Sequence, residues 1–148
     1  MKIGLACDHR GYSLKTKIAK YLTKKGYEIT DFGTTSTSSV DYPNFAILLG
    51  EAVRDKEVDF GIAICKTGIG ISIACNKVNG IRCAKVDNTS EAKHCILDNN
   101  ANIIALNGEM PTYRAYDILD IVLKTKYIET DRHQRRIDLI TDYEKNRG

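Results

Sequence analysis

One cysteine in this chain stands where a thiolate would be stabilised. Cys65 directly follows the apolar run Phe60–Ile64, and the glycine-rich stretch Thr67–Ser72 comes shortly after it. The run is typical of a buried strand, and residues 73–77 have a helical pattern. A turn from strand to helix leaves backbone N–H groups unpaired and directs the positive end of the helix dipole at the same space. Because the thiolate is the reactive form of cysteine, we expect the chemistry of the protein at Cys65.

A buried structural thiol is the alternative interpretation of any cysteine in a reducing compartment. Three others fit it, since nothing near them in sequence would activate them: Cys75, Cys83 and Cys95. Cys65 alone precedes a glycine-rich turn, and Lys66 adds positive charge. The glycines are not a dinucleotide fingerprint, because the third glycine position counted from Gly68 holds Ile73. The turn amides therefore suit a small anion or a developing enediolate.

Two further groups of polar residues could act on a ligand. Asp8 and His9 directly follow the apolar run Ile3–Cys7, although an ordinary cap at a strand end explains such a pair equally well. Arg132 and Arg136 lie one turn apart on a helical pattern and could both bind a phosphate. Taken alone, a solvated basic face is the more common meaning of that run.

Composition excludes several classes of protein. A length of 148 residues favours one domain spanning 1–148, and 43% hydrophobic with 28% charged residues is typical of globular proteins. The net charge of +3 is too small to predict a nucleic-acid or membrane partner. No apolar run approaches the roughly 20 residues of a membrane span, and no signal-peptide pattern opens the chain. Five cysteines without a CxxC pair predict neither a disulfide framework nor a metal site, so we expect a cytoplasmic protein.

Strand and helix patterns alternate along the chain. Strand patterns occupy residues 3–7, 27–32, 59–64, 81–86 and 102–106. Helix patterns occupy residues 12–25, from Pro43 to about 54, 73–77, from the capping residues 87–91 to about 97, 112–124 and 132–146. This alternation predicts an α/β fold, a three-layer Rossmann-like sandwich with a five-stranded parallel sheet. In such sheets sites lie outside the carboxyl ends of the strands, where Asp8, His9 and Cys65 fall. The last helix follows no further strand, and we expect it to pack on a partner subunit.

Together these residues resemble the ribose-5-phosphate isomerase type B family, which includes the galactose-6-phosphate isomerase subunits. The resemblance covers nearly the whole chain through five blocks in order: Asp8-His9, Asp41-Tyr42-Pro43, Cys65 to Lys77, Asn99-x-Ala101-Asn102 and Arg132-His133-Gln134-x-Arg136. It implies a metal-free aldose–ketose interconversion of sugar phosphates without a cofactor. It also implies a homodimer with active sites between the subunits, and leaves a tetramer open.

The resemblance implies a role for each motif residue. Cys65 is the base that moves a proton between C1 and C2 through a cis-enediolate, and Thr67 helps exchange protons between O1 and O2. Asp8 assists opening of the furanose ring. The intermediate is held by turn amides and one side chain: Gly68, Ile69, Gly70, Ile71, Ser72 and Asn99. The remaining substrate contacts are Tyr42 at the sugar, and at the phosphate His9 with Arg132 and Arg136 of a partner subunit.

Three positions depart from the family pattern. Asp98 stands where the family commonly has the histidine that acts as the acid in ring opening, so Asp98 is the expected acid, with His94 one helical turn away as the alternative. Glu109 stands for an arginine, and Lys66 for a glycine. The expected activity is interconversion of D-ribose 5-phosphate and D-ribulose 5-phosphate in the non-oxidative pentose phosphate route. The alternatives are a six-carbon isomerase acting on allose or galactose 6-phosphate, and a non-catalytic sugar-phosphate-binding subunit.

Overall fold

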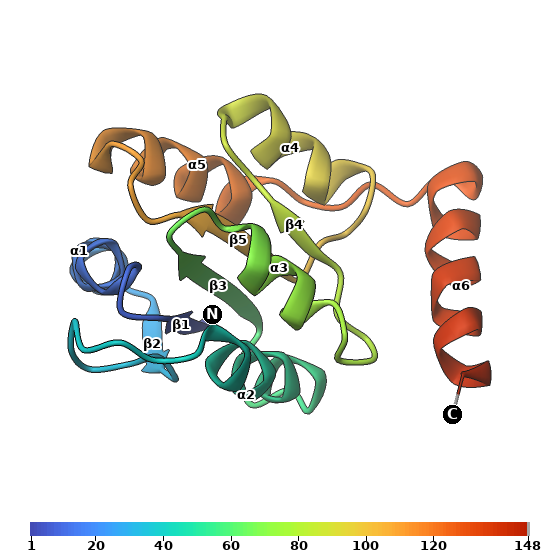
Figure 1. Cartoon of the computed structure of the whole chain (residues 1–148). Helices are drawn as coiled ribbons and strands as arrows, with labels where there is room; N and C mark the ends of the chain where they lie inside the picture. The colour runs from blue at the N-terminus through green and yellow to red at the C-terminus, as the bar shows by residue number, and fades with distance from the viewer. Residues whose placement is uncertain (148) are drawn as a thin grey trace.

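A parallel sheet lies between two layers of helices in the computed structural model, which describes residues 1–147 (Figure 1). The strands are β1 (Lys2–Cys7), β2 (Glu28–Asp31), β3 (Phe60–Cys65), β4 (Cys83–Lys85) and β5 (Ile103–Asn107). The helices are α1 (Tyr12–Lys24), α2 (Tyr42–Arg54), α3 (Ile69–Cys75), α4 (Thr89–Leu97), α5 (Thr112–Lys124) and α6 (Asp131–Asn146). All strand pairs are parallel, in the order β2-β1-β3-β5-β4. The predicted fold class is confirmed.

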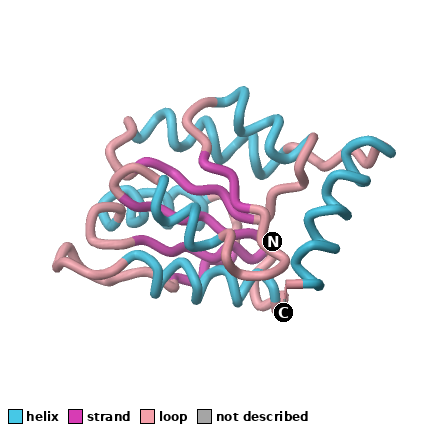
Figure 2. The backbone as a smooth tube through the Cα atoms, turned by 45° about the vertical axis from the view of Figure 1, so that its right-hand side comes forward, coloured by secondary structure: helices cyan, strands magenta, loops and turns pink. Residues whose placement is uncertain are grey.

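Each face of the sheet carries its own apolar core. Helices α1, α4 and α5 cover one face, where Leu14, Ile96 and Ile118 pack with strand residues such as Ile62 and Ile104. Helices α2 and α3 cover the other face around Leu49, Ile71 and Ile103. Figure 2 shows the strands enclosed by helices on both sides. Because both faces are buried, the strands are continuous apolar runs rather than alternating ones.

Local signals explain where the helices begin and end. Gly26 has a φ of +93°, which ends α1 in a left-handed turn. Pro43 occupies the first turn of α2, where its missing N–H is not needed. The Asn88 side chain accepts a hydrogen bond from the Glu91 backbone N–H at 2.8 Å and so caps α4. Strand β4 is shorter than the predicted 81–86.

The strand order places a topological switch point between β1 and β3. The chain leaves β1 toward β2 on one side, and β3 lies on the other side of β1. The loops that follow β1 and β3 therefore leave the sheet in a shared crevice. A Cβ on Gly11 would lie 2.5 Å from the carbonyl oxygen of Ile64. Glycine at this position lets the loop after β1 cross the end of β3.

Helix α6 stands outside both layers. It lies at the end of the sheet away from the arrowhead of β3, next to the amino ends of the strands (Figure 1). Ile137 is its only buried residue, and Leu139, Ile140 and Tyr143 are more than half exposed. Its far end is fixed by Glu144, whose Oε2 accepts a hydrogen bond from the Gly80 backbone N–H at 2.9 Å. Within residues 1–147 no helix combines the length and apolar character that a membrane crossing needs.

Candidate active site

Cys65 lies at the carboxyl end of β3 and faces a backbone donor. Its Sγ accepts a hydrogen bond from the Gly68 N–H at 3.2 Å, and the residue is only 5% exposed. Gly68 has a φ of +79°, and a Cβ there would lie 3.0 Å from the carbonyl carbon of Leu106. Only glycine therefore allows this turn between β3 and α3. The course of the turn therefore holds the Gly68 N–H against the sulfur.

Burial dominates the environment of the other cysteines, and their thiols face carbonyl oxygens: Cys7 that of Thr34, Cys75 that of Ala46 and Cys95 that of Ala92. Burial raises the pKa of both Cys7 and Cys95 to about 11. A hydrogen bond with Cys75, and burial, raise the pKa of Cys83 well above its ordinary value. All five cysteines are free. At neutral pH these three are thiols, which agrees with a structural role for Cys83 and Cys95.

Asp8 is a buried carboxylate held in one orientation. Its Oδ1 accepts hydrogen bonds from the backbone N–H groups of Arg10 at 2.9 Å and Gly11 at 3.1 Å. Its own N–H donates to the Ile64 carbonyl at 3.2 Å, which places Asp8 beside the residue that precedes Cys65. Within residues 1–147 no hydrogen bond reaches Oδ2. The backbone thus orients the carboxylate and leaves one oxygen available to a ligand.

His9 presents one ring nitrogen. Its Nδ1 accepts a hydrogen bond from the Val40 backbone N–H at 3.2 Å. In the neutral imidazole this assigns the proton to Nε2. The Nε2–H is therefore the donor that His9 can offer to an anion at this edge of the sheet.

Tyr42 packs directly on the glycine turn. A Cβ on Gly70 would lie 2.6 Å from Cζ and 2.8 Å from the hydroxyl oxygen of Tyr42. The close approach of the ring requires glycine at this position. Tyr42 is 36% exposed, so its hydroxyl borders the site and solvent together.

The turn holds fewer free amides than its sequence suggests. The Gly68 N–H is bound to Cys65, and the Ile69 N–H donates to the Thr67 Oγ1 at 3.1 Å. The Ser72 N–H donates to the Gly68 carbonyl at 3.3 Å. Among the described residues no acceptor takes the N–H of Gly70 or Ile71. Those two amides are the ones that an oxyanion could use.

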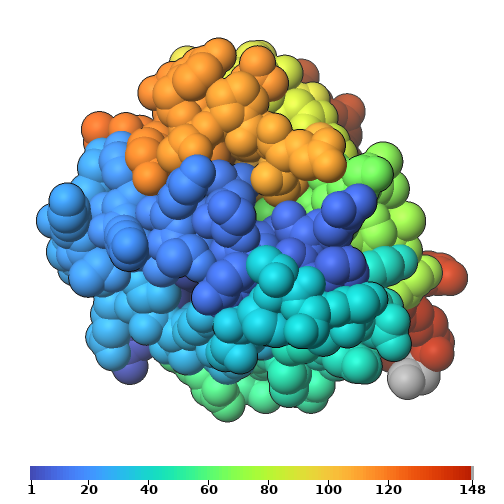
Figure 3. Space-filling view, turned by 60° about the vertical axis from the view of Figure 1, so that its left-hand side comes forward, coloured from blue at the N-terminus to red at the C-terminus, as the bar shows by residue number. Residues whose placement is uncertain are grey.

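Figure 3 shows this carboxyl edge of the sheet. The loop after β1, in blue, meets the segment before α2, in cyan, the start of α3, in green, and the loop before α5, in orange. The atoms of α6, in red, appear only at the margin of this face. We call Asp8, His9, Tyr42, Cys65 and the 67–72 turn the carboxyl-edge group.

The other expected site residues lie at the opposite edge. The Asn99 carbonyl accepts a hydrogen bond from the Arg82 Nε at 3.1 Å, and Arg82 directly precedes β4. Cys65 instead pairs with Asn107 at the end of β5. The length of β5, about 13 Å, separates the two positions. We call Asp98, Asn99, Arg132, His133 and Arg136 the amino-edge group; within one chain it does not reach Cys65.

Asp98 lies between two imidazoles. Its Oδ1 is 3.5 Å from the Nε2 of His133 in α6, and its Oδ2 is 3.6 Å from the Nδ1 of His94 in α4. The His133 side chain is 16% exposed and that of His94 is 60% exposed. Sequence reasoning included His133 only as a letter in a motif and missed its contact with Asp98. No spacing rule relates residues from two separate helices.

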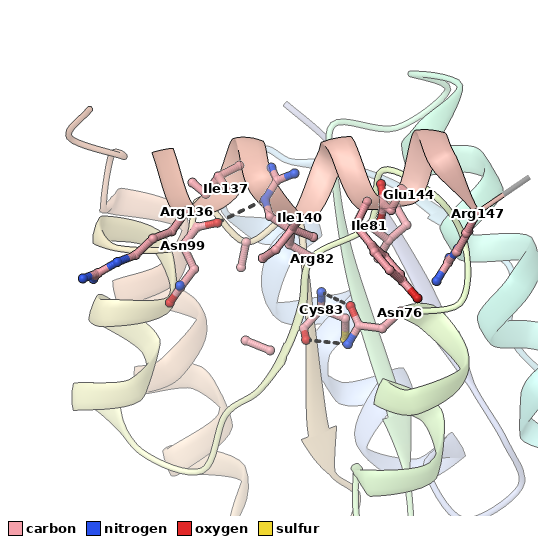
Figure 4. Close-up of a pocket in the computed structure, with 13 residues that line it drawn as sticks. Asn76, Ile81, Arg82, Cys83, Asn99, Arg136, Ile137, Ile140, Glu144 and Arg147 are labelled. Atoms are coloured by element: carbon pink, nitrogen blue, oxygen red, sulfur yellow. Dashed lines mark hydrogen bonds between the residues drawn. The ribbon is translucent and has the colours of Figure 1, made fainter. Parts of the chain in front are cut away.

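A hollow of about 490 Å³ separates α6 from the edge of β4 (Figure 4). Arg82 and Asn99 are joined there by a hydrogen bond, and the guanidinium of Arg136 extends away from the other labelled side chains. Burial lowers the pKa of Arg82, and the nearby Glu144 carboxylate opposes that change. Arg136 is thus presented outward from its own chain, where it could bind a group on another molecule.

Comparison with known proteins agrees with the motifs. The profile of the Ribose/Galactose Isomerase family matches residues 3–140. Ribose-5-phosphate isomerase B of Escherichia coli (strain K12) is 40% identical over 148 residues, which are 99% of this chain and 99% of that protein. The structure of Clostridium thermocellum ribose-5-phosphate isomerase B has a TM-score of 0.97 and 47% identity, and covers 100% of both chains. Ribose-5-phosphate isomerase B of Mycoplasma genitalium, solved with bound ribulose-5-phosphate, has a TM-score of 0.92 and 37% identity over 98% of this chain and 97% of that chain. The resemblance inferred from the sequence is confirmed: the chain belongs to the ribose/galactose isomerase family.

Proposed function

We propose that this chain is an aldose–ketose isomerase that interconverts D-ribose 5-phosphate and D-ribulose 5-phosphate. Family membership and relatives named ribose-5-phosphate isomerase B confirm the expected enzyme class. The relative solved with ribulose-5-phosphate supports a sugar phosphate as substrate. The observation that carries the proposal is Cys65, whose sulfur faces the Gly68 amide at the switch point of the sheet.

The carboxyl-edge group can perform the isomerisation. Asp8, with Oδ2 free, accepts the proton of the O1 hydroxyl as the ring opens. The Cys65 thiolate then takes the proton from C2 of the aldehyde and returns it to C1, through a cis-enediolate. The free N–H groups of Gly70 and Ile71 stabilise the negative oxygen of that intermediate. Thr67 lies beside them to exchange protons between O1 and O2.

A second copy of the chain would complete the site. In a two-fold dimer the same two surfaces meet twice, so the amino-edge group of each copy can face the carboxyl-edge group of the other. Asn99 then joins the turn amides, and Arg132 and Arg136 join His9 at the phosphate. The exposed apolar side chains of α6 support such pairing. The free thiols support a cytoplasmic location.

Substitution of Cys65 tests the base directly. Cys65→Ala should lower turnover at least about a thousandfold, because no other group can move the C1–C2 proton. Cys83→Ala is the matched control, since it removes a thiol that is not in the carboxyl-edge group. Turnover is measured with ribose 5-phosphate, and the thermal transition verifies that both variants fold. Near-normal turnover of Cys65→Ala would contradict the proposed role of Cys65 as the base.

A mixing experiment tests whether two copies share the site. Cys65→Ala and Arg136→Ala are each expected to be nearly inactive alone. Refolded together at equal amounts, they should regain about a quarter of the unaltered activity, since half of the dimers are mixed and each has one intact site. Arg135→Ala, which removes a neighbouring charge on α6, should keep its activity alone. If mixing restores nothing, the site is not shared.

The preferred sugar is tested by comparing ribose 5-phosphate with allose and galactose 6-phosphate at matched concentrations. We expect the largest kcat/KM with the five-carbon substrate. A larger value with a six-carbon sugar would assign the chain to the alternative activity. Binding of all three without turnover would favour a non-catalytic subunit.

A further inference from the structure

We propose that His133, positioned by Asp98, is the acid that protonates the ring oxygen when the furanose opens, in the active site of a second copy of the chain. This inference rests on the proposed function. It assigns the acid to α6 and not to the two residues that the sequence suggests, His94 on α4 and Asp98 directly after it.

One backbone hydrogen bond and one close side-chain contact place His133. Its backbone N–H donates to the Thr130 Oγ1 at 3.2 Å, in the first turn of α6. Its ring nitrogen Nε2 is 3.5 Å from the Asp98 Oδ1. Within residues 1–147 no partner reaches the other nitrogen, Nδ1. A carboxylate on one nitrogen and a free second nitrogen is the arrangement that orients a histidine for proton transfer.

Asp98 is suited to hold the imidazole and not to donate a proton. Both of its oxygens face imidazole nitrogens, at 3.5 Å in His133 and 3.6 Å in His94. An ionised carboxylate between two such groups is only an acceptor. Asp98 is therefore a positioning residue.

His94 is less suited to the role than His133. Its side chain is 60% exposed, against 16% for His133, so water competes for its nitrogens. His133 also lies next to Arg132 and one turn from Arg136, the residues proposed to bind the phosphate. Phosphate binding there would bring the substrate to α6. The acid is then on the same helix as the group that binds the substrate.

The ring-opening step balances with these groups. The bond between C1 and the ring oxygen O4 breaks, and its electron pair goes to O4. The imidazolium of His133 gives its Nδ1 proton to O4, while the O1 hydroxyl gives its proton to Asp8 and the C1=O1 bond forms. The products are a neutral His133 with its remaining proton facing Asp98, and a protonated Asp8. Exchange with water restores both groups, and nothing is oxidised or reduced.

Ring opening can be separated from enediolate chemistry because the two substrates differ in form. Ribulose 5-phosphate is acyclic, since the oxygen that could close a five-membered ring carries the phosphate. Exchange of its C1 proton with D2O needs the base and the enediolate, but no ring opening. Conversion of ribose 5-phosphate needs every step. Both reactions are followed by NMR on the same refolded, full-length variants.

His133→Gln keeps the size of the side chain and should lower the kcat for ribose 5-phosphate about a hundredfold. Its KM and its C1 exchange rate with ribulose 5-phosphate should change less than about threefold. Asp98→Asn should give the same pattern with a smaller loss, and His94→Gln should keep both reactions. Equal loss of both reactions in His133→Gln, or no loss, overturns the inference. So does the same selective loss in His94→Gln.

The two proposals fail differently. An active chain whose His133→Gln variant converts ribose 5-phosphate normally contradicts this inference and leaves the proposed function standing. An unaltered chain that neither converts ribose 5-phosphate nor exchanges the C1 proton of ribulose 5-phosphate contradicts both.

Discussion

The carboxyl-edge group and the amino-edge group are built by different means. Asp8 and Cys65 are fixed by hydrogen bonds from backbone N–H groups two or three residues further along the chain. In the amino-edge group, Asp98 contacts His133 from another helix, and Asn99 is held by Arg82, 17 residues away. The first group is therefore assembled by the local course of two loops. The second depends on how α4, β4 and α6 pack together.

The two groups of residues are suited to different tasks, one to the chemistry and one to contact with a second molecule. Enediolate chemistry needs a base and donors at fixed short distances, and a switch point with close-packed glycines supplies them. The amino-edge group is instead presented outward at one end of the molecule. It suits a group that must reach a second molecule. Changes at the two edges should therefore differ in which step they impair.

Removal of α6 should have the largest effect on activity. A chain ending at Thr130 loses Arg132, His133 and Arg136 together, so turnover of ribose 5-phosphate should fall below detection. The fold should survive, because Ile137 is the only buried residue of α6. The melting temperature should drop by only a few degrees, about what 1 kcal/mol produces in a domain of this size. Collapse of the fold in circular dichroism would show that α6 is part of the core.

Gly70→Ala, a change in the carboxyl-edge group, should lower activity less than removal of α6 does. The added Cβ would lie 2.6 Å from the Tyr42 ring, which must move away from the turn. We expect kcat/KM to fall about tenfold to a hundredfold because a small displacement of positioning groups is costly. The double variant Gly70→Ala with Tyr42→Ala tests the cause, since the clash is then absent. If the single variant is fully active, Tyr42 is not held against the site.

Arg82→Ala should lower both the stability of the fold and the activity that depends on the amino-edge group. The Arg82 side chain donates to the carbonyl groups of Asn99 and Asn100, where α4 ends. Loss of these contacts should cost about 1–3 kcal/mol in urea unfolding and lower kcat several-fold. C1 exchange of ribulose 5-phosphate should be affected less than conversion of ribose 5-phosphate. Arg54→Ala is the control, because Arg54 is exposed and its ion pairs within residues 1–147 are with Glu51 on α2 and with Asp55 directly after it.

The two groups also differ in how much of each can be predicted from the sequence. The order of strands and helices along the chain follows from apolar runs, glycines and caps, which are local signals. The switch point beside Cys65 depends on the lateral order of the strands, which these signals do not give. Asp98 and Asn99 lie between a helix and the next strand, so a parallel sheet alone places them at the amino ends of the strands. What faces them there depends on β4 lying at the edge of the sheet and on α6 packing beside it, which no local pattern gives. The Asp98–His133 contact joins residues 35 positions apart, one at the end of α4 and one in α6. Only tertiary packing determines it.

The amides of the 67–72 turn show a second limit of prediction from the sequence. The sequence predicts amides throughout the 67–72 turn, yet the Thr67 hydroxyl and the Cys65 sulfur each take one of them. Which amides stay free depends on side-chain rotation within the turn. Residue types alone do not determine that rotation.

The last prediction concerns Cys7, which lies at the same edge of the sheet as Cys65, and its effect on the pH dependence of unfolding. Cys7 ends β1 as Cys65 ends β3, but burial raises the pKa of Cys7 from 9.0 to about 11, so folding favours its thiol. An unfolded chain then loses this proton near pH 9 and the folded chain only near pH 11, so the free energy of unfolding is unaffected below pH 9 and falls between these values. Cys7→Ser, which removes the titrating group, should unfold in urea with a weaker dependence on pH from 9 to 11. An unchanged dependence would mean that Cys7 ionises as readily in the folded chain as in the unfolded one, so that burial at the end of β1 does not hold it as a thiol.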